Sequence, residues 1–398
     1  MDITIQPGPL NGTVRAIPSK SQAHRLMICA AFSDAQTYLE CLQTNADIEA
    51  TARCLNALGA EILRTNDGYQ ISPINTTPEE AVLDCGESGS TLRFLLPVAC
   101  ALGVEATFQM QGRLPYRPLS PMWEELVRMG CSLSRPTETT IHTSGKLHSG
   151  EFSLSGKVSS QFITGLLFAT ALLEGSSQII ITDALESKSY VEITQAALKT
   201  FGVITDNYCV MGNYPFHTPG QISVEGDWSN GAFWLAAKAL GNSLTVTNLD
   251  AQSPQGDKAC ADILAKLAEN ITVSAADIPD LVPILAVVAG AKKGAVFTDI
   301  ARLRLKESDR VASVCNILNT LGAEAFADDN TLTVRPGKYH ACTIDAVNDH
   351  RIAMSVAIAA TIADGPITIL GAECVSKSYP AFWQVYEALG GKYEQYIR

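Results

Sequence analysis

Leu318-Asn319-Thr320-Leu321-Gly322-Ala323 closes an amphipathic run of residues, and the same ending recurs along the whole chain. The other copies are Leu55-Asn56-Ala57-Leu58-Gly59-Ala60, Leu126-Val127-Arg128-Met129-Gly130-Cys131, Leu198-Lys199-Thr200-Phe201-Gly202-Val203 and Tyr386-Glu387-Ala388-Leu389-Gly390-Gly391. A glycine after an amphipathic run is typical of the left-handed residue that ends a helix. A sixth copy, Leu264-Ala265-Lys266-Leu267-Ala268-Glu269, lacks the glycine. The sequence therefore predicts a chain built from internal repeats.

A second set of expected helices alternates with the first and consists of small and apolar residues on nearly every side. These helices span Arg25 to Phe32, Thr91 to Leu102, Phe162 to Leu173, Ala232 to Leu240, Leu281 to Ala289 and Ile352 to Ile362. A helix that is apolar all round must be buried. Strand-like residues follow the helices, so we expect the sheets outside the buried helices. Six repeats result, and the fourth is shortened, since the interval from Asn230 to Asp280 is the smallest between helix starts.

The six repeats divide into two groups of three, which predicts two domains. One is expected to comprise residues 1–18 plus 225–398, and the other residues 19–224. The predicted fold class is α/β, with buried helices and with sheets on the outer faces of each domain. The helix N-termini are then expected to share one end of each domain, with a functional site in the cleft between the two domains.

Composition limits the class of protein. The chain has 398 residues, 46% of them hydrophobic and 18% charged, with a formal net charge of -12, which suits a globular protein of two or three domains. The acidic balance argues against nucleic acid as a main partner, because phosphate backbones are bound by clustered Lys and Arg. The first residues lack the features of a signal peptide, and no apolar run approaches membrane-spanning length. We therefore expect a cytoplasmic protein with no membrane partner.

No pattern in the sequence indicates a metal or an organic cofactor. The eleven cysteines are scattered and never spaced as Cys-x-x-Cys, which indicates reduced core thiols. The six histidines show no metal-binding spacing, and the phosphate-binding loop of P-loop proteins is absent. His350 is either a ligand contact or a helix cap, while the other histidines are expected on the surface or in the core.

Polar residues gather at the expected helix starts, where free backbone N–H groups and the helix dipole form a ready anion site. Seven cations belong to this set: Lys20, Arg25, Arg117, Lys306, Arg310, Arg351 and Lys377. Singly, the Ser, Asp and Asn residues around them are ordinary helix caps. Seven cations at the same end of their helices, in a protein of net charge -12, predict a basic cleft for one or two small, multiply anionic substrates.

The run from Lys306 to Arg310 carries two cations and two carboxylates directly before the apolar stretch from Val311 to Leu321. Taken alone, the run is either a capped surface helix, with Glu307 and Asp309 near its positive end, or part of a site. The other helix starts favour the second interpretation, because they place similar residues at equivalent positions.

Together these motifs resemble the EPSP synthase (3-phosphoshikimate 1-carboxyvinyltransferase) family of enolpyruvyl transferases, from the first strand to the last helix. The matching residues are Ser19-Lys20-Ser21 with Arg25, Gly89-Ser90 with Arg93, Arg117-Pro118, Ser159-Ser160-Gln161, Leu305 to Arg310, Asn348-Asp349-His350-Arg351 with Ala353-Met354, and Lys377. The resemblance implies the two-domain enolpyruvyl transferase fold of six βαβαββ repeats. It also implies a transferase of the shikimate pathway, in aromatic amino acid biosynthesis, that needs no cofactor; we expect it to be a monomer.

The resemblance also implies the reaction and the residues that carry it. The enolpyruvyl group of phosphoenolpyruvate would pass to the 5-hydroxyl of shikimate 3-phosphate by addition and elimination, with phosphate released. The implied catalytic residues are Lys20, Asp280 and Glu307. The implied contacts of shikimate 3-phosphate are Lys20, Ser21, Arg25, Ser159, Ser160, Gln161, Ser187, Tyr190, Asp280 and Lys306. Those of phosphoenolpyruvate are Lys20, Gly89, Arg117, Gln161, Arg310, Arg351 and Lys377.

Two features depart from the family pattern, and two other functions compete with the one implied. Glu87 and Arg302 stand where some members carry Asn, and the fourth repeat has little room for its last two strands. One competing function is UDP-N-acetylglucosamine 1-carboxyvinyltransferase, which usually has a Cys on the loop that here runs from Gln111 to Ser120 without one. The other is a non-catalytic anion-binding relative, against which the retained Lys20, Asp280, Glu307 and site arginines argue.

Overall fold

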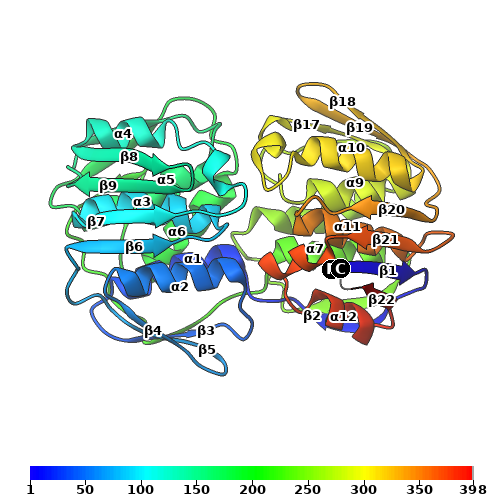
Figure 1. The fold of residues 1–398 in the computed structure, drawn as a ribbon, viewed down its shortest axis with the longest axis horizontal. Coiled ribbons are helices and arrows are strands. Elements are labelled where there is room, and N and C mark those ends of the chain that lie inside the picture. The colour runs from blue at the N-terminus through cyan, green and yellow to red at the C-terminus, as the bar shows by residue number, and fades with distance from the viewer. Residues whose placement is uncertain (397–398) are drawn as a thin grey trace. The chain divides into compact units, whose positions relative to one another are not determined.

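The computed structural model describes residues 1–396 and divides them into two compact units (Figure 1). Unit 1 combines Met1–Ile17 with the chain from Glu225 onward, and unit 2 is Pro18–Val224. The chain thus leaves unit 1 after its first strands, builds the whole of unit 2, and then returns.

Unit 2 consists of long helices with three four-stranded sheets. Its helices are α1 (Lys20–Ala31), α2 (Ala46–Ala57), α3 (Gly89–Leu102), the 3-10 turn η1 (Leu114–Tyr116), α4 (Met122–Arg128), α5 (Ser160–Leu172) and α6 (Lys188–Thr200). Its strands are β3 (Thr37–Glu40), β4 (Glu61–Arg64), β5 (Gly68–Ser72), β6 (Glu80–Asp84), β7 (Glu105–Gln109), β8 (Cys131–Thr137), β9 (Thr140–Gly145), β10 (Glu151–Leu154), β11 (Ser177–Ile181), β12 (Thr205–Asp206), β13 (Cys209–Val210) and β14 (Gln221–Ser223).

Unit 1 has the same kinds of elements, with two four-stranded sheets and one two-stranded sheet. Its helices are α7 (Trp228–Ala239), η2 (Gly256–Ala259), α8 (Cys260–Lys266), α9 (Val282–Ala291), η3 (Ala301–Leu305), α10 (Arg310–Leu321), α11 (His350–Ala360), η4 (Ala372–Lys377) and α12 (Phe382–Ala388). Its strands are β1 (Asp2–Gln6), β2 (Asn11–Arg15), β15 (Ser243–Thr247), β16 (Ile271–Ser274), β17 (Ala295–Thr298), β18 (Glu324–Ala327), β19 (Thr331–Arg335), β20 (Cys342–Asp345), β21 (Ile367–Leu370) and β22 (Lys392–Tyr396).

All five four-stranded sheets share one topology, which confirms the predicted repeat. In the sheet β6-β7-β9-β8 the first two strands pair in parallel, and the remaining pairs are antiparallel. The same pattern recurs in β10-β11-β13-β12 and β16-β17-β19-β18. The parallel pair requires a crossover helix, and that helix is the buried one, such as α3 between β6 and β7. The α/β fold class with βαβαββ repeats is therefore confirmed.

Two sheets take one strand from a distant part of the chain. In unit 2, β14 pairs in parallel with β3, with Gln221 opposite Tyr38. In unit 1, β1 lies between β21 and β22, with Ile3 opposite Ile369 and Gln395. These two strands complete repeats that are interrupted where the chain passes between the units.

The fourth repeat is short, as its sequence predicts. Its sheet is only β15 paired in parallel with β2, and the strand after α8 is β16, which belongs to the next repeat. The two antiparallel strands found in the other repeats are missing from this part of the described chain.

The glycine endings act as predicted, and the asparagine in two of them has a role that sequence reasoning did not find. Gly59 and Gly322 both adopt a φ of 107°, in the left-handed region. Asn56 bridges from the end of α2 to Ile62 in β4, where its Oδ1 accepts from the backbone N–H at 2.7 Å. Asn319 makes the equivalent contact from α10 to Ala325 in β18 at 2.8 Å. The repeated motif thus fixes the helix and the following strand together.

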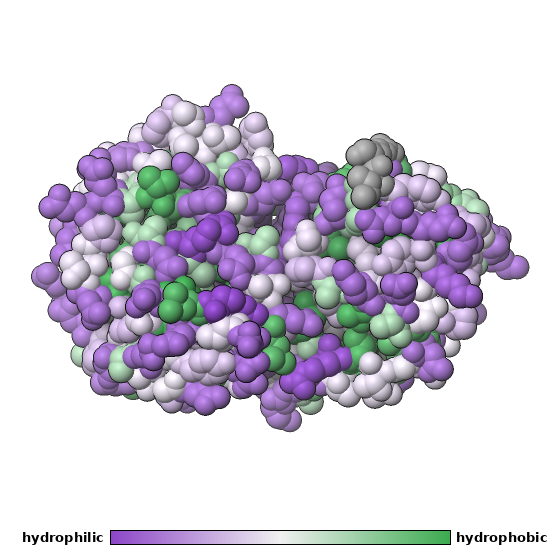
Figure 2. All heavy atoms as spheres, turned by 60° about the horizontal axis from the view of Figure 1, so that its bottom comes forward, coloured by the Kyte–Doolittle hydropathy of each residue, from purple (hydrophilic) through white to green (hydrophobic). Residues whose placement is uncertain are grey.

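The helices that are apolar all round form the two cores. In unit 2, residues 92–101 of α3 and 162–171 of α5 are buried throughout, and these two helices pack on each other. Strands β6 to β9 run across α3 in Figure 1. In unit 1, α7, α9 and α11 are buried in the same way. The face drawn in Figure 2 is mostly hydrophilic, with apolar atoms in small separate patches, as expected when the apolar residues fill internal cores.

One expectation about helix starts is wrong. Arg117 and Lys377 lie before the amphipathic helices and not at their first turns, since α4 begins at Met122 and α12 at Phe382. Arg117 is extended, with ψ of 140°, because Pro118 follows it and a residue before proline is driven out of the helical region. Both cations instead adjoin short 3-10 turns, η1 and η4.

All eleven cysteines are free thiols, and most of them are buried. Within residues 1–396, no helix has both the length and the apolar character needed to cross a membrane.

Candidate active site

Asp280 is the centre of a charged cluster in unit 1. It lies just before α9, and its Oδ1 accepts from Arg310 Nη1 at 2.7 Å and lies 3.2 Å from Lys306 Nζ. Its Oδ2 accepts from Arg351 Nη2 at 3.1 Å. Three predicted cations, one directly after η3 and one each from α10 and α11, therefore converge on one predicted carboxylate.

Arg310 is held from three sides although its side chain is only 1% exposed. Its Nε donates to Asp349 Oδ2 at 2.9 Å, and its Nη2 donates to Glu307 Oε2 at 2.7 Å. Asp349 is completely buried and also caps α11, because its Oδ1 accepts from the backbone N–H of Arg351 at 3.0 Å. A buried charge of this kind is tolerated only when it is paired and hydrogen-bonded.

The charges in this cluster shift one another's proton affinities. Burial acts to raise the pKa of Asp280, but Arg351, Lys306 and Arg310 outweigh it and hold that pKa well below its usual value. Burial lowers the pKa of Lys306 to about 8, even though Asp280 favours its charged form. Asp280 therefore stays ionised at neutral pH, while Lys306 loses its proton more readily than an ordinary lysine.

Glu307 and Lys377 lie at the edge of the same cluster. The Glu307 side chain is 27% exposed, so it is reachable by a ligand while Arg310 fixes its orientation. Lys377 Nζ donates to the backbone carbonyl of Asn348 at 3.0 Å, which places η4 beside the start of α11. All six predicted residues of unit 1 are thus joined by a continuous set of contacts.

Arg25 is the most deeply buried predicted cation of unit 2. It is 2% exposed, and its Nε donates to Thr194 Oγ1 at 2.7 Å. Its other donors reach the carbonyl oxygens of Ser21 at 2.6 Å and Tyr190 at 2.9 Å. Burial lowers its pKa to about 9. These partners are neutral groups, so the positive charge is available to an anionic ligand.

A second group in unit 2 surrounds the start of α3. Arg93 Nη1 donates to Gln161 Oε1 at 2.8 Å, and Gln161 Nε2 donates to Ser90 Oγ at 2.9 Å. Gly89 is packed so tightly that a Cβ added to it would lie 2.6 Å from Arg117 Nη1. The structure therefore brings Gly89, Arg117 and Gln161 together through Arg93.

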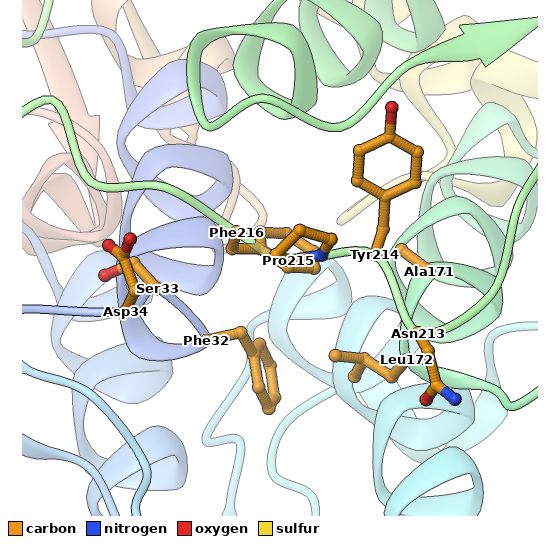
Figure 3. Close-up of a pocket in the computed structure, with 9 residues that line it drawn as sticks. All are labelled: Phe32, Ser33, Asp34, Ala171, Leu172, Asn213, Tyr214, Pro215 and Phe216. Atoms are coloured by element: carbon orange, nitrogen blue, oxygen red, sulfur yellow. The ribbon is translucent and has the colours of Figure 1, made fainter.

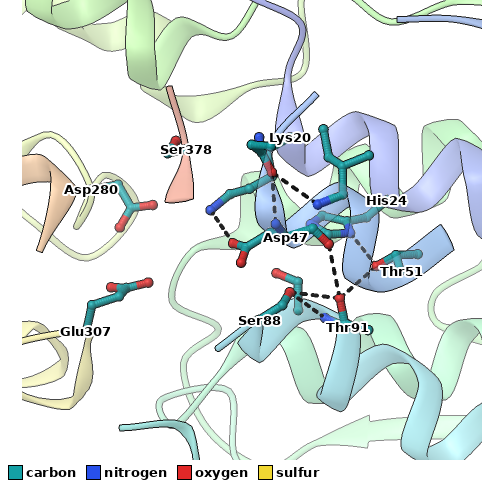
Figure 4. Close-up of polar contacts among 12 residues, drawn as sticks. Lys20, His24, Asp47, Thr51, Ser88, Thr91, Asp280, Glu307 and Ser378 are labelled. Carbon is teal, nitrogen blue, oxygen red and sulfur yellow. Dashed lines mark hydrogen bonds and ion pairs between the residues drawn. The ribbon is translucent and has the colours of Figure 1, made fainter. Parts of the chain in front are cut away.

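The remaining predicted residues occupy the helix starts of unit 2. Lys20 is the first residue of α1, and its Nζ lies 2.9 Å from Asp47 Oδ2 on α2 (Figure 4). Ser159 caps α5, and Ser160 is the buried first residue of that helix. Ser187 precedes α6 in the left-handed conformation, with φ of 55°.

Sequence reasoning missed two carboxylates and left one histidine open. Asp47 resembles an ordinary acidic residue in the first turn of a helix, and only the contact with Lys20 sets it apart. Asp349 was noted as part of a motif, but its pairing with Arg310 was not foreseen. The cap of α11 is Asp349, and His350 is the buried first residue of the helix.

These residues form no metal site within the described chain, and they do not line the pocket drawn in Figure 3. Within residues 1–396 no group of three or more His, Cys, Asp or Glu side chains is placed to hold a metal ion. A pocket of about 360 Å³ in unit 2 is lined by Phe32, Ser33, Asp34, Ala171, Leu172, Asn213, Tyr214, Pro215 and Phe216 (Figure 3). It lies beyond the C-terminal ends of α1 and α5, so the helix starts discussed above do not line it.

Comparison with known proteins assigns the family. A profile of the EPSP synthase (3-phosphoshikimate 1-carboxyvinyltransferase) family matches residues 5–386. The chain belongs to the EPSP synthase family. The 3-phosphoshikimate 1-carboxyvinyltransferase of Clostridium acetobutylicum is 39% identical to it over 417 residues, covering 98% of this chain and 97% of the relative. That of Clostridium novyi is 38% identical over 426 residues, covering 98% of both chains.

Solved structures share the fold of this EPSP synthase family member. An EPSP synthase from Acinetobacter baumannii matches with a TM-score of 0.81 and 22% identity, covering 99% of this chain and all of the other. The enolpyruvyl transferase NikO from Streptomyces tendae matches with a TM-score of 0.79 and 15% identity. The enolpyruvyl transferase fold expected from the sequence is therefore confirmed.

Proposed function

We propose that this EPSP synthase family member transfers the enolpyruvyl group of phosphoenolpyruvate to the 5-hydroxyl of shikimate 3-phosphate. The observation that carries the proposal is the cluster around Asp280, in which three cations converge on one carboxylate beside the partly exposed Glu307. Cations suit the phosphate and carboxylate of phosphoenolpyruvate, and the carboxylates suit proton transfer. The family match over nearly the whole chain supports the same function.

The proposed phosphoenolpyruvate contacts are Lys20, Gly89, Arg117, Gln161, Arg310, Arg351 and Lys377. The proposed shikimate 3-phosphate contacts are Lys20, Ser21, Arg25, Ser159, Ser160, Gln161, Ser187, Tyr190, Asp280 and Lys306. Each of these two groups of contacts contains residues from unit 1 and from unit 2, so the proposed active site requires both units. Its location in the cleft between two domains, 1–18 plus 225–398 and 19–224, is part of this proposal.

The proposed reaction has two steps. In the first, the 5-hydroxyl oxygen bonds to C2 of phosphoenolpyruvate, the hydroxyl loses its proton, and C3 gains one, which gives a tetrahedral intermediate. In the second, C3 loses a proton and the bond from C2 to the phosphate oxygen breaks, which restores the double bond. Both steps need a positioned acid and base, and we assign Glu307 and Lys20 to this work.

Asp280 is better suited to orienting the hydroxyl than to removing its proton. A carboxylate with a strongly lowered pKa is a weak base, although it still accepts a hydrogen bond from the substrate hydroxyl. Arg310 and Arg351 fix its two oxygens, so the hydroxyl would meet it in one direction. Prealigned charges of this kind lower the barrier because they need no reorganisation during reaction.

Phosphate release tests the proposal directly. Purified protein is expected to release phosphate from phosphoenolpyruvate only when shikimate 3-phosphate is present, and the product mass should equal that of the enolpyruvyl ether. Release with UDP-N-acetylglucosamine in place of shikimate 3-phosphate would support the competing transferase. Tight binding of both substrates with no release would support the non-catalytic relative.

We also propose that the protein acts as a monomer in the cytoplasm, without a metal or an organic cofactor. Light scattering after gel filtration measures the mass, for which the expected value is that of one 42.5 kDa chain. Turnover should survive dialysis against EDTA, and loss of activity on dialysis would overturn the cofactor part of the proposal.

A further inference from the structure

Two rungs of polar contact join α1 and α2 one helical turn apart. The outer rung is the ion pair of Lys20 with Asp47, 2.9 Å long, whose side chains are 18% and 19% exposed. The inner rung joins His24 Nδ1 to Thr51 Oγ1 at 2.7 Å, and both residues are fully buried. Residues four apart lie on the same face of a helix. His24 is therefore one turn below Lys20, and Thr51 one turn below Asp47.

The inner rung continues to the start of α3. Thr51 Oγ1 lies 2.7 Å from Thr91 Oγ1, and Thr91 donates to Ser88 Oγ at 2.8 Å (Figure 4). Ser88 caps α3 by accepting from the backbone N–H of Thr91 at 3.2 Å, and Gly89 follows it directly. One series of hydrogen bonds thus joins the N-terminal halves of α1, α2 and α3, and both α1 and α3 carry proposed substrate contacts.

The direction of donation along this series of hydrogen bonds determines the tautomer of His24. A threonine hydroxyl has a single hydrogen. Because Thr91 donates to Ser88, Thr51 must donate to Thr91, so His24 must donate to Thr51 from Nδ1. His24 is then neutral, with a hydrogen on Nδ1 and a bare Nε2 that has no hydrogen-bond partner among the described residues.

The surroundings keep His24 in that state. Burial, followed by the charges of Lys20 and Arg25, lowers its pKa well below the usual value. Its ring meets Phe94 edge-on, with centroids 6.2 Å apart, which leaves little freedom for the ring to turn. A fixed neutral ring that donates one hydrogen bond is suited to holding neighbouring helices at a set spacing.

We propose that His24 is a positioning residue that acts through Thr51 and Thr91 to place Lys20, Asp47 and the Gly89 turn for phosphoenolpyruvate. The inference rests on the proposed function for its kinetic consequence, but the geometry stands on its own. If the inner rung is lost, α1 and α2 are free to shift, and the Lys20 ammonium moves with α1. A displacement of about 1 Å in a substrate-positioning group costs up to about a hundredfold in rate.

Three variants test the chain of contacts. His24→Leu removes the hydrogen-bond donor and keeps a side chain of similar volume. Thr51→Val removes the hydroxyl in the middle of the series of hydrogen bonds. His24→Asn restores a donor close to the place of Nδ1. We expect the first two to raise the KM for phosphoenolpyruvate at least about tenfold, and His24→Asn to return it to within about threefold of wild type. Thr170→Val is the matched control, because it removes a buried hydroxyl that bonds only within α5.

The KM separates positioning from a merely structural role. A structural role would lower the folded fraction, which reduces the apparent kcat and leaves KM unchanged, so an unchanged KM in folded His24→Leu and Thr51→Val would overturn the inference. Crystal structures of these variants give a readout that does not depend on activity. We expect the contact between Lys20 and Asp47 to be broken in them, and an intact contact would equally overturn the inference. Failure of the proposed function would show separately, as a wild-type protein that releases no phosphate.

Discussion

Asp349 Oδ2 accepts a hydrogen bond from Arg310 Nε at 2.9 Å, and both side chains are buried. The same carboxylate caps α11 and accepts from Ser308 Oγ at 2.9 Å. Asp349 therefore supports a proposed phosphoenolpyruvate contact without being one itself, and its removal should affect both folding and binding.

Asp349→Ala is expected to lower the free energy of unfolding by about 3 kcal/mol, because it removes one member of a buried ion pair and the cap of α11, while Arg310 keeps its other two carboxylate partners. Urea denaturation followed by circular dichroism measures the loss. Asp345→Asn is the control and should leave the stability nearly unchanged. Asp345 is exposed, and the side-chain oxygen of the new asparagine can still accept from the N–H of Val347. Equal stability of the two variants would contradict the role given to Asp349.

Glu307→Gln is expected to bind both substrates and to lose at least about a hundredfold in kcat, since general acid–base groups contribute about 10²–10⁴ to rate. Stability should change little, because the glutamine keeps an oxygen for Arg310 Nη2. Equilibrium binding together with steady-state kinetics separates the two effects. The neighbouring variant Asp309→Asn keeps a helix cap and should turn over normally. Near-normal turnover in Glu307→Gln would remove Glu307 from the chemistry.

Lys306 should give the enzyme an alkaline limit. Its pKa is lowered to about 8, so its charge is lost as the pH rises through that value and anion binding weakens. We expect the KM for shikimate 3-phosphate to rise above pH 8. Lys306→Arg should remove that rise, because a guanidinium keeps its charge throughout this range. A wild-type KM that stays constant to pH 9.5 would contradict this prediction.

Gly89→Ala should weaken phosphoenolpyruvate binding through sterics alone. The added methyl group would lie 2.6 Å from Arg117 Nη1 and 2.8 Å from Arg93 Nη1, so both guanidinium groups must move. A loss of about 1.4 kcal/mol corresponds to a tenfold rise in KM. The comparison is Gly86→Ala, which adds its methyl group to open space nearby but carries some strain at φ of 53°. Parallel changes in the two variants would point to backbone strain and not to the arginines.

His24 should make the protein less stable in mild acid. Its pKa in the folded chain is well below 6.5, whereas in the unfolded chain it has the ordinary value. As the pH falls below about 6.5, the unfolded chain takes up a proton that the folded chain does not. The free energy of unfolding should then fall by up to about 1.4 kcal/mol per pH unit. His24→Asn should lack this contribution, and identical pH profiles would contradict it.

The repeat could be predicted from sequence because its signals are local. Gly322 and Gly59 mark helix ends through their own backbone conformation, and an apolar stretch such as residues 282–289 fits a buried helix in a chain of alternating helices. The placement of β1 beside β21 was beyond such reasoning, since register between distant strands depends on tertiary packing.

The candidate site likewise contains residues that the sequence could predict and residues that it could not. Cations such as Arg310 and Arg351 were recognisable from their positions near helix starts and from the family resemblance. The partners of Lys20 and His24 were not recognisable, because Asp47 and Thr51 have ordinary residue types for the helix they occupy. Only the packing of α2 against α1 shows that these two residues face Lys20 and His24. The start of α4 lies later than expected because Pro118 keeps Arg117 out of the helical region, while the late start of α12 follows the 3-10 turn η4, which includes Lys377.

The position of β1 between β21 and β22 imposes an order on assembly at the ribosome. Thr4 must wait for Thr368, 364 residues later, before their hydroxyls can meet. Unit 2, by contrast, has all its strands once β14 has emerged. Domains generally fold as units as they emerge. Residues 18–224 should therefore fold first, while β1 stays unpaired until the final segment is released. A nascent chain stalled at a point where Val224 has left the ribosome should already resist proteolysis from residue 18 onward.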